Sequence, residues 1–83
     1  MISKNTQNKI NKFFINPSKE FLLTLEEYNR LTPFEKGYWS YLQSSWPESE
    51  IPEDKNPFEP GTTKCSEFIK GSYRGMLYAQ DSE

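Results

Sequence analysis

The 83-residue chain contains no histidine and a single cysteine, Cys65. Histidine is the commonest general base and metal ligand, and a zinc-binding or nucleophilic cysteine needs partners that are missing here. The glycines match neither a phosphate-binding loop nor a dinucleotide fingerprint. These absences predict a protein that is not an enzyme and that binds no metal and no cofactor. Cys65 shares a helical face with Phe68 and Met76, so we expect it in the core.

The chain also has no long apolar run. No stretch approaches the roughly 18 residues of a membrane span, and the N-terminus lacks the apolar segment of a signal peptide. One cysteine cannot form an internal disulfide, which fits a reducing compartment. The sequence therefore predicts a cytoplasmic protein with no membrane partner.

Aliphatic residues are scarce and aromatic residues are abundant. Valine is absent and 16% of the residues are Phe, Tyr or Trp. Each buried ring removes more surface from water than an aliphatic side chain does, so a small core needs few of them. Disordered chains are poor in aromatic residues. We expect a single domain, residues 1–83, with an aromatic core.

Charge is distributed unevenly along the chain. Residues 1–19 contain four lysines and no acid, and residues 20–59 contain nine acids and three basic residues. Nucleic-acid-binding surfaces are usually basic, so only the N-terminal arm, residues 1–16, is suited to direct contact with phosphate. The acidic middle is either an ordinary solvated surface or a face for a basic protein partner.

Proline positions and apolar spacing predict an all-α fold with helices near residues 17–31, 33–45 and 62–79. Asn16 and Pro17 resemble an N-cap and a first helical residue. Thr32 precedes Pro33 and is followed by Glu35, which completes a capping box. Thr62 or Thr63 caps the last helix.

A fourth helix at the N-terminus is also predicted. Ile10, Phe13 and Phe14 have helical spacing, although Phe13 to Ile15 alone would also suit a strand.

Residues 46–61 contain four prolines and five acids, a composition that excludes a helix or strand. Ile51 and Phe58 are apolar anchors that would hold this acidic loop over the core. Trp46 has no partner on a helical face, which favours an interface anchor surrounded by carboxylates. The alternative is a solvated loop with no partner. The predicted partner-binding residues are Trp46, Glu48, Glu50, Glu53, Asp54 and Glu59.

Two glycines, Gly71 and Gly75, lie four residues apart in the last predicted helix. Each costs about 1 kcal/mol of helix stability relative to alanine, so the missing side chains must serve a purpose. We expect close approach to the Gly37–Tyr38 region or to the turn at residues 57–58. The predicted packing residues are Gly37, Pro57, Phe58, Phe68, Gly71 and Gly75.

Three short motifs follow one another in residues 34–79. They are Gly37-Tyr38, Asn56-Pro57-Phe58 and Phe68-Ile69-Lys70-Gly71-Ser72-Tyr73-Arg74-Gly75. In this order they resemble the ribosome modulation factor family, which consists of small two-helix proteins and includes phage- and plasmid-borne relatives. The resemblance implies a helix–turn–helix packing. The family's ribosome-binding members are strongly basic and bind ribosomal RNA and protein, whereas this chain is acidic and matches their arginines only at Arg74.

Two functional hypotheses remain. Small, acidic, aromatic-rich chains without catalytic residues resemble phage-encoded inhibitors of host machinery, including anti-CRISPR proteins. The first hypothesis is therefore a non-enzymatic protein that binds and modulates a larger bacterial assembly in the cytoplasm, either a ribonucleoprotein or a nucleic-acid-binding complex. The second is a ribosome-binding, hibernation-type factor that uses the helical pair and the basic N-terminal arm. The net charge of −2 favours the first.

Overall fold

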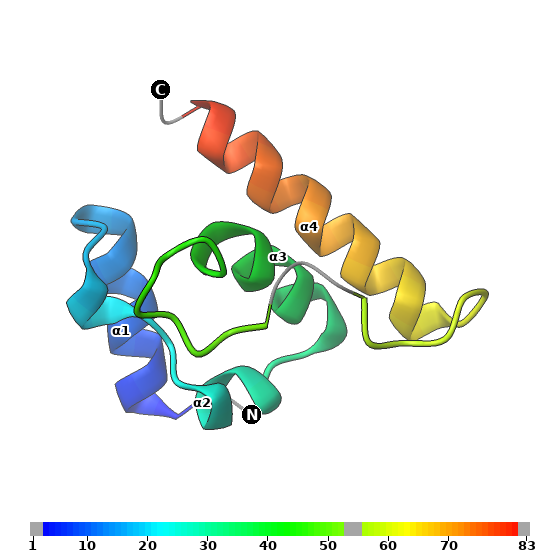
Figure 1. Ribbon diagram of the computed structural model, residues 1–83, viewed down its shortest axis with the longest axis horizontal. Coiled ribbons are helices and arrows are strands. Elements are labelled where there is room, and N and C mark those ends of the chain that lie inside the picture. Colours follow the sequence, from blue (N-terminus) through cyan, green and yellow to red (C-terminus); the bar gives the residue numbers. More distant parts are fainter. Residues whose placement is uncertain (1–2, 53–55, 82–83) are drawn as a thin grey trace.

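The computed structural model describes residues 3–52 and 56–81, and every regular element in these ranges is helical. The elements are α1 (Lys4–Ile15), the 3-10 turn η1 (Lys19–Phe21), α2 (Leu25–Asn29), α3 (Pro33–Gln43) and α4 (Thr63–Asp81). Helix α3 is central: α1, η1 and α2 lie on one side of it, and α4 crosses its other side (Figure 1). The all-α prediction is confirmed, including the fourth, N-terminal helix.

The predicted helix over residues 17–31 is wrong. Asn16 ends α1 instead of beginning a helix, and its N–H donates to the Lys12 carbonyl at 2.8 Å. The chain then forms the short turn η1 and becomes extended at Leu22. A second capping box, made by Thr24 and Glu27, begins the short helix α2. The basic N-terminal arm is thus mostly helix α1.

The core lies between α1, α2 and one face of α3. Phe13 of α1 packs edge-on against Trp39 of α3, with ring centroids 5.6 Å apart. Ile51 of the acidic loop enters the same cluster, so the loop is anchored as expected at this end. The buried apolar residues of the cluster are Ile10, Phe13, Leu22, Leu23, Tyr28, Leu31, Trp39 and Ile51.

Two fully buried polar side chains of α3 hold irregular backbone against the core. The Gln43 carboxamide accepts a hydrogen bond from the Leu23 N–H at 2.9 Å and donates to the Phe21 carbonyl at 3.4 Å. The Ser40 hydroxyl donates to the Pro52 carbonyl at 3.2 Å. Buried backbone groups without partners are costly. Gln43 and Ser40 therefore provide hydrogen-bond partners for backbone groups that lie outside the helices.

Helices α3 and α4 touch backbone to backbone at glycine. A Cβ atom at Gly37 would lie 2.9 Å from the carbonyl carbon of Phe68 and closer still to its oxygen. A Cβ atom at Gly71 would lie 2.8 Å from the carbonyl carbon of Phe34. The two contacts are reciprocal, and each helix carries the same Phe-x-Lys-Gly sequence. Because these glycines have no side chain, the backbones of α3 and α4 can approach each other this closely.

The end of the acidic loop is ordered by local hydrogen bonds. The Asn56 carboxamide accepts from the Phe58 N–H at 3.0 Å and donates to the Cys65 carbonyl at 3.1 Å. Phe58 packs edge-on against Phe68, with centroids 6.2 Å apart. Thr62 caps α4, because its hydroxyl accepts from the Cys65 N–H at 3.2 Å. Cys65 itself is buried, as predicted.

One polar contact joins α1 to α2. The Glu27 carboxylate accepts from the Thr6 hydroxyl at 2.9 Å, from the Lys9 ammonium at 2.7 Å and from the Thr24 N–H at 2.9 Å. Lys9 also donates to the Leu22 carbonyl at 3.3 Å. The same carboxylate therefore caps α2 and attaches α1 to it.

This contact predicts an acid-sensitive contribution to stability. Burial raises the pKa of Glu27, but the hydrogen bonds from Lys9, Thr24 and Thr6 and the charge of Lys9 outweigh it, so the pKa lies below its ordinary value of 4.5. Because the folded-state pKa is the lower one, the stabilisation is present above pH 4.5 and is lost as the pH falls through the folded-state value. Urea unfolding between about pH 5 and pH 3 should show a smaller loss of stability for Glu27→Gln than for the wild type. The exposed Glu26→Gln is the control, and a wild-type pH dependence in Glu27→Gln would contradict the assignment.

Candidate binding groove

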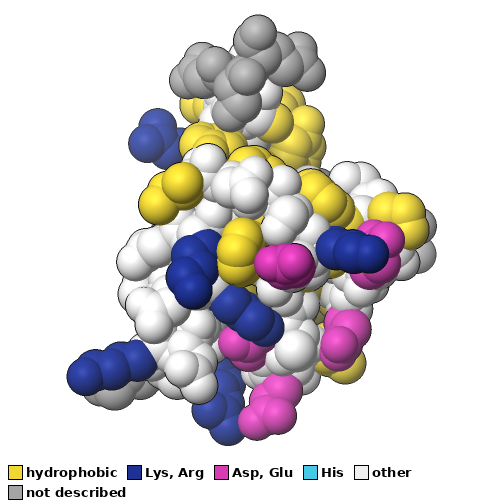
Figure 2. Space-filling model, turned by 90° about the vertical axis from the view of Figure 1, so that its left-hand side faces the viewer, with side chains coloured by type: hydrophobic (Ala, Val, Ile, Leu, Met, Phe, Trp, Pro, Cys, Tyr) yellow, Lys and Arg dark blue, Asp and Glu magenta, His cyan; other side chains and the backbone are white. Residues whose placement is uncertain are grey.

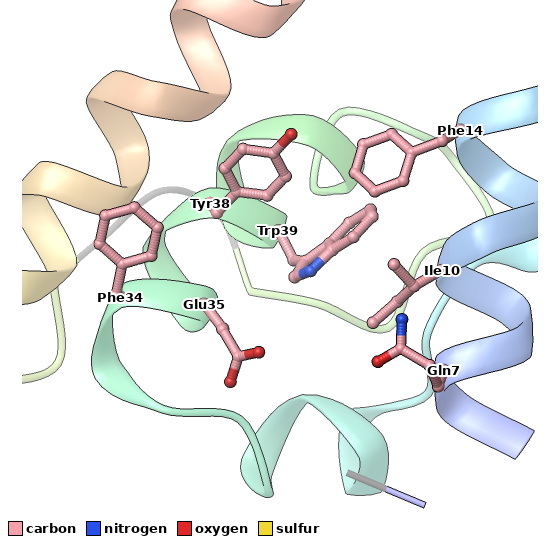
Figure 3. Close-up of a pocket in the computed structure, with 7 residues that line it drawn as sticks. All are labelled: Gln7, Ile10, Phe14, Phe34, Glu35, Tyr38 and Trp39. Atoms are coloured by element: carbon pink, nitrogen blue, oxygen red, sulfur yellow. The ribbon is translucent and has the colours of Figure 1, made fainter. Parts of the chain in front are cut away.

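An open groove of about 230 Å³ lies between α1 and α3. It is lined by Gln7, Ile10, Phe14, Phe34, Glu35, Tyr38 and Trp39. The rings of Phe34, Tyr38 and Phe14 form an arc along one side, and the Glu35 carboxylate and the Gln7 carboxamide lie across from them (Figure 3). We call this feature the aromatic groove.

Phe14 is the centre of an aromatic cluster that joins three helices. Its ring lies 5.3 Å from that of Trp39 and 6.2 Å from that of Tyr38 on α3, and 5.1 Å from that of Tyr78 on α4. Phe14 is nevertheless 36% exposed, whereas Trp39 is only 3% exposed. The groove therefore has a buried ring, that of Trp39, and partly exposed rings at its edge.

Glu35 places a negative charge in this apolar surface. One carboxylate oxygen accepts the Thr32 N–H at 3.0 Å, which completes the capping box at the start of α3. The neighbouring Lys36 points elsewhere, toward the rings of Tyr28 and Phe58. Among the described residues, no lysine or arginine forms an ion pair with Glu35. The groove thus contains a carboxylate without a cationic partner.

Two further polar groups border the aromatic groove. The Trp39 indole N–H forms no hydrogen bond with the described parts of the chain. Burial raises the pKa of Tyr38, the adjacent Tyr78 raises it further, and Arg74 partly offsets both effects. The Tyr38 hydroxyl therefore remains protonated at neutral pH and can act as a donor.

The predicted partner-binding residues have different surroundings in the structure. Trp46, expected to lack a core role, is half-buried and packs edge-on against Phe13 at 6.1 Å, so that expectation is wrong, while its contact with a partner stays a prediction. Glu50 accepts the Leu25 N–H at 3.1 Å. Glu48 and Glu59 are exposed. Glu53 and Asp54 lie outside the described residues.

Of the predicted packing residues, Gly37, Phe68, Gly71 and Gly75 lie at the contact between α3 and α4. Gly75 lies beside Gly37 and Gly71 in this contact, and a Cβ atom there would approach the Tyr38 carbonyl oxygen to 2.9 Å. Phe68 is buried under Phe58, while Pro57 is exposed. The turn at residues 57–58 therefore covers the start of α4, and the glycines face α3.

The lysines of the N-terminal arm do not form a separate basic surface. Lys9 is paired with Glu27, and the Lys12 ammonium lies 6.0 Å from the centre of the Phe21 ring. On the face that includes α1, basic side chains lie among carboxylates (Figure 2). This mixture reduces the attraction that the sequence alone suggested for phosphate.

Helix α4 contributes a second exposed apolar feature. Ile69 and Tyr73 lie one turn apart and are 59% and 56% exposed. Their spacing places them on one face, away from the glycines that contact α3. Nothing among the described residues covers this face of α4.

The sequence did not reveal the groove. The sequence predicts Glu35 only as part of a helix cap, and the structure confirms that role and also places Glu35 in the groove. The only signal for the groove in the sequence was the helical spacing of Glu35 from Tyr38 and Trp39. This spacing does not show that α1 lies opposite these residues. Among the described residues, no group of acidic or cysteine side chains could hold a metal ion, and no helix is long and apolar enough to cross a membrane.

No known protein family, curated protein or solved structure matches this chain. The observed fold and groove define its class: a small all-helical domain in which α3 packs against α4 at glycines and forms an aromatic groove with α1.

Proposed function

We propose that this chain is a non-enzymatic interaction protein that binds a larger bacterial macromolecular assembly and modulates or inhibits it, in the manner of phage-encoded inhibitors such as anti-CRISPR proteins. The observation that carries the proposal is the aromatic groove, with its partly exposed rings and the Glu35 carboxylate, which forms no ion pair with the described residues. Aromatic residues dominate the energetics of protein interfaces, and clefts with a few fixed polar groups are where side chains of partners dock.

The surface charge supports a protein partner over a nucleic acid. Glu48 and Glu59 are exposed on the acidic loop, and most of the basic residues of α1 lie near acids or rings. Such a surface repels phosphate and steers encounter with a basic protein surface. A basic groove that normally holds nucleic acid is a fitting target for these carboxylates.

A second candidate function, ribosome binding, rests on the helix pair. The backbone contact at Gly37 and Gly71 lies in the stretch that resembles the ribosome modulation factor family. The acidic charge weighs against it, since that family's ribosome-binding members bind RNA through basic residues.

The two functions are distinguished by capture from a bacterial lysate. The immobilised full-length chain is compared with Phe14→Ser, which removes the central ring of the aromatic cluster, and the captured proteins and RNA are identified. A nuclease or other nucleic-acid-binding complex that is retained by the wild type and lost with Phe14→Ser supports the first function. Ribosomal proteins with ribosomal RNA support the second. Equal capture by the two chains would contradict a role for the groove.

Neutralising the acidic loop should weaken binding of the captured partner. We expect the variant with Glu48, Glu50, Glu53 and Asp54 changed to Gln or Asn to bind several-fold more weakly at low salt, with a flatter salt dependence. Glutamine at position 50 keeps an acceptor for the Leu25 N–H, so the loop retains that contact. The measurement is affinity across a salt series. Unchanged affinity and slope would remove the loop from the interface.

A further inference from the structure

The aromatic groove contains polar groups whose partners are missing. Glu35 has no cation beside it among the described residues, and the Trp39 indole N–H has no acceptor there. We propose that the groove binds an arginine side chain presented by the partner protein. This inference rests on the proposed function, because it names the chemistry of the partner at the same site.

The charge of Glu35 selects a cationic occupant. An anionic group would be repelled at this position, and a purely apolar side chain would bury the carboxylate without compensation. One oxygen of Glu35 already accepts the Thr32 N–H, which fixes the orientation of the carboxylate. A cation in the groove would therefore meet a pre-oriented acceptor.

The rings favour a guanidinium over an ammonium. Phe34, Tyr38 and Phe14 line the side of the groove across from Glu35 (Figure 3). A guanidinium is planar, stacks on aromatic rings and is more weakly hydrated than an ammonium, so it loses less on leaving water. At about 230 Å³ the groove has the volume of roughly eight water molecules, which is enough for one long side chain.

The remaining polar groups suit a peptide as the source of the arginine. The Trp39 indole N–H can only donate, and the Gln7 carboxamide can both donate and accept. Backbone carbonyl and N–H groups next to the arginine provide the complementary acceptor and donor. Arg74 of this chain lines a neighbouring cavity together with Tyr38, Leu77 and Tyr78. It does not line the aromatic groove.

The test uses an isolated probe, N-acetylarginine methylamide, with the full-length ¹⁵N-labelled chain. The chain has two tryptophans, so two indole N–H signals are expected in a nitrogen–proton correlation spectrum. Trp46→Phe leaves one of them and thereby assigns both. We expect the Trp39 indole signal to shift saturably at millimolar probe, with little change in the Trp46 signal. The same titration with N-acetylcitrulline methylamide, which has a similar shape without the charge, should produce no saturable shift.

Glu35→Gln removes the charge and retains the helix cap, because glutamine also serves in a capping box. We expect this variant to melt near the wild-type temperature and to bind the arginine probe at least about tenfold more weakly, a difference of about 1.4 kcal/mol. Glu67→Gln, an equal change of charge on the exposed part of α4, is the matched control and should bind as the wild type does.

Several results would overturn the inference. These are the absence of a saturable Trp39 shift with the arginine probe, an equal shift with the citrulline probe, and full binding by Glu35→Gln. A lysine derivative that binds more tightly than the arginine probe would also overturn the choice of guanidinium. The probe experiment requires no partner protein. If the probe does not bind, a positive capture from lysate still supports the proposed function. If the capture fails, binding of the probe still supports the arginine site.

Discussion

Replacing Gly71 with leucine should destabilise the protein by about 3 kcal/mol, near the upper end of the usual cost of overpacking a core. The added Cβ atom would overlap the Phe34 carbonyl group and lie 3.0 Å from the Tyr38 N–H nitrogen. These neighbours are helix backbone and cannot rotate away, so α4 must move off α3. For a domain of this size the melting temperature should fall by roughly 12–24 °C.

The sign of the stability change in Gly71→Leu shows whether α3 and α4 are in close contact at this position. In an unconstrained helix, replacing glycine with leucine gains helix stability, because glycine is about 0.8–1 kcal/mol less favourable than alanine. Ser66→Leu, at an exposed position of the same helix, is the control and should change the melting temperature little. If Gly71→Leu melted at or above the wild-type temperature, the close contact between α3 and α4 would be wrong.

Replacing Gln43 with leucine should cost about 2–3 kcal/mol, although leucine is more apolar and similar in size. The substitution leaves the Leu23 N–H and the Phe21 carbonyl without their side-chain partner. An unsatisfied buried backbone group costs about 1–3 kcal/mol, and the bond to Leu23 is the shorter and more buried of the two. The measurement is the free energy of unfolding in urea.

Gln80→Leu, near the exposed end of α4, is the matched control for this change and should alter stability by less than about 0.5 kcal/mol. Hydrogen exchange adds a local readout, since the Leu23 N–H should lose protection in Gln43→Leu beyond the global change. A Gln43→Leu protein as stable as the wild type would show that residues 21–24 do not depend on this side chain.

Helices α3 and α4 were predictable because their signals are local. Thr32, Pro33 and Glu35 satisfy the first turn of α3 whatever surrounds it, and Thr62 does the same for α4. The glycines of α4 were recognisable as packing residues because they are costly in a helix. The matching Phe-x-Lys-Gly segments of α3 and α4 are also visible in the sequence, but only the structure shows that the two segments face each other.

The error over residues 17–31 arose from two competing local signals. Asn16 and Pro17 resemble a helix start, and Thr24 with Glu27 is a second start further along the chain. Between the two starts, Gln43, twenty residues away from Leu23, holds the non-helical backbone that precedes Thr24. No pattern within residues 17–31 contains that information.

Trp46 and Glu35 show the same limit at the candidate site. Trp46 lies beyond the end of α3, and its ring partner Phe13 comes from α1. Glu35 is visible in the sequence as a cap, but its place in an apolar groove depends on the position of Ile10 and Phe14 across from it. Both assignments needed the packing of α1 against α3.

The sequence alone determined the all-helical class, the starts of α3 and α4 and the aromatic character of the core, because capping, proline geometry and composition act within a few residues. The tertiary structure decided which rings remain exposed, which carboxylate lies in the groove and where the chain is extended. These features depend on the packing of α1 and α4 against α3 and on the hydrogen bond from the Leu23 N–H to Gln43, which all join residues that are distant in sequence.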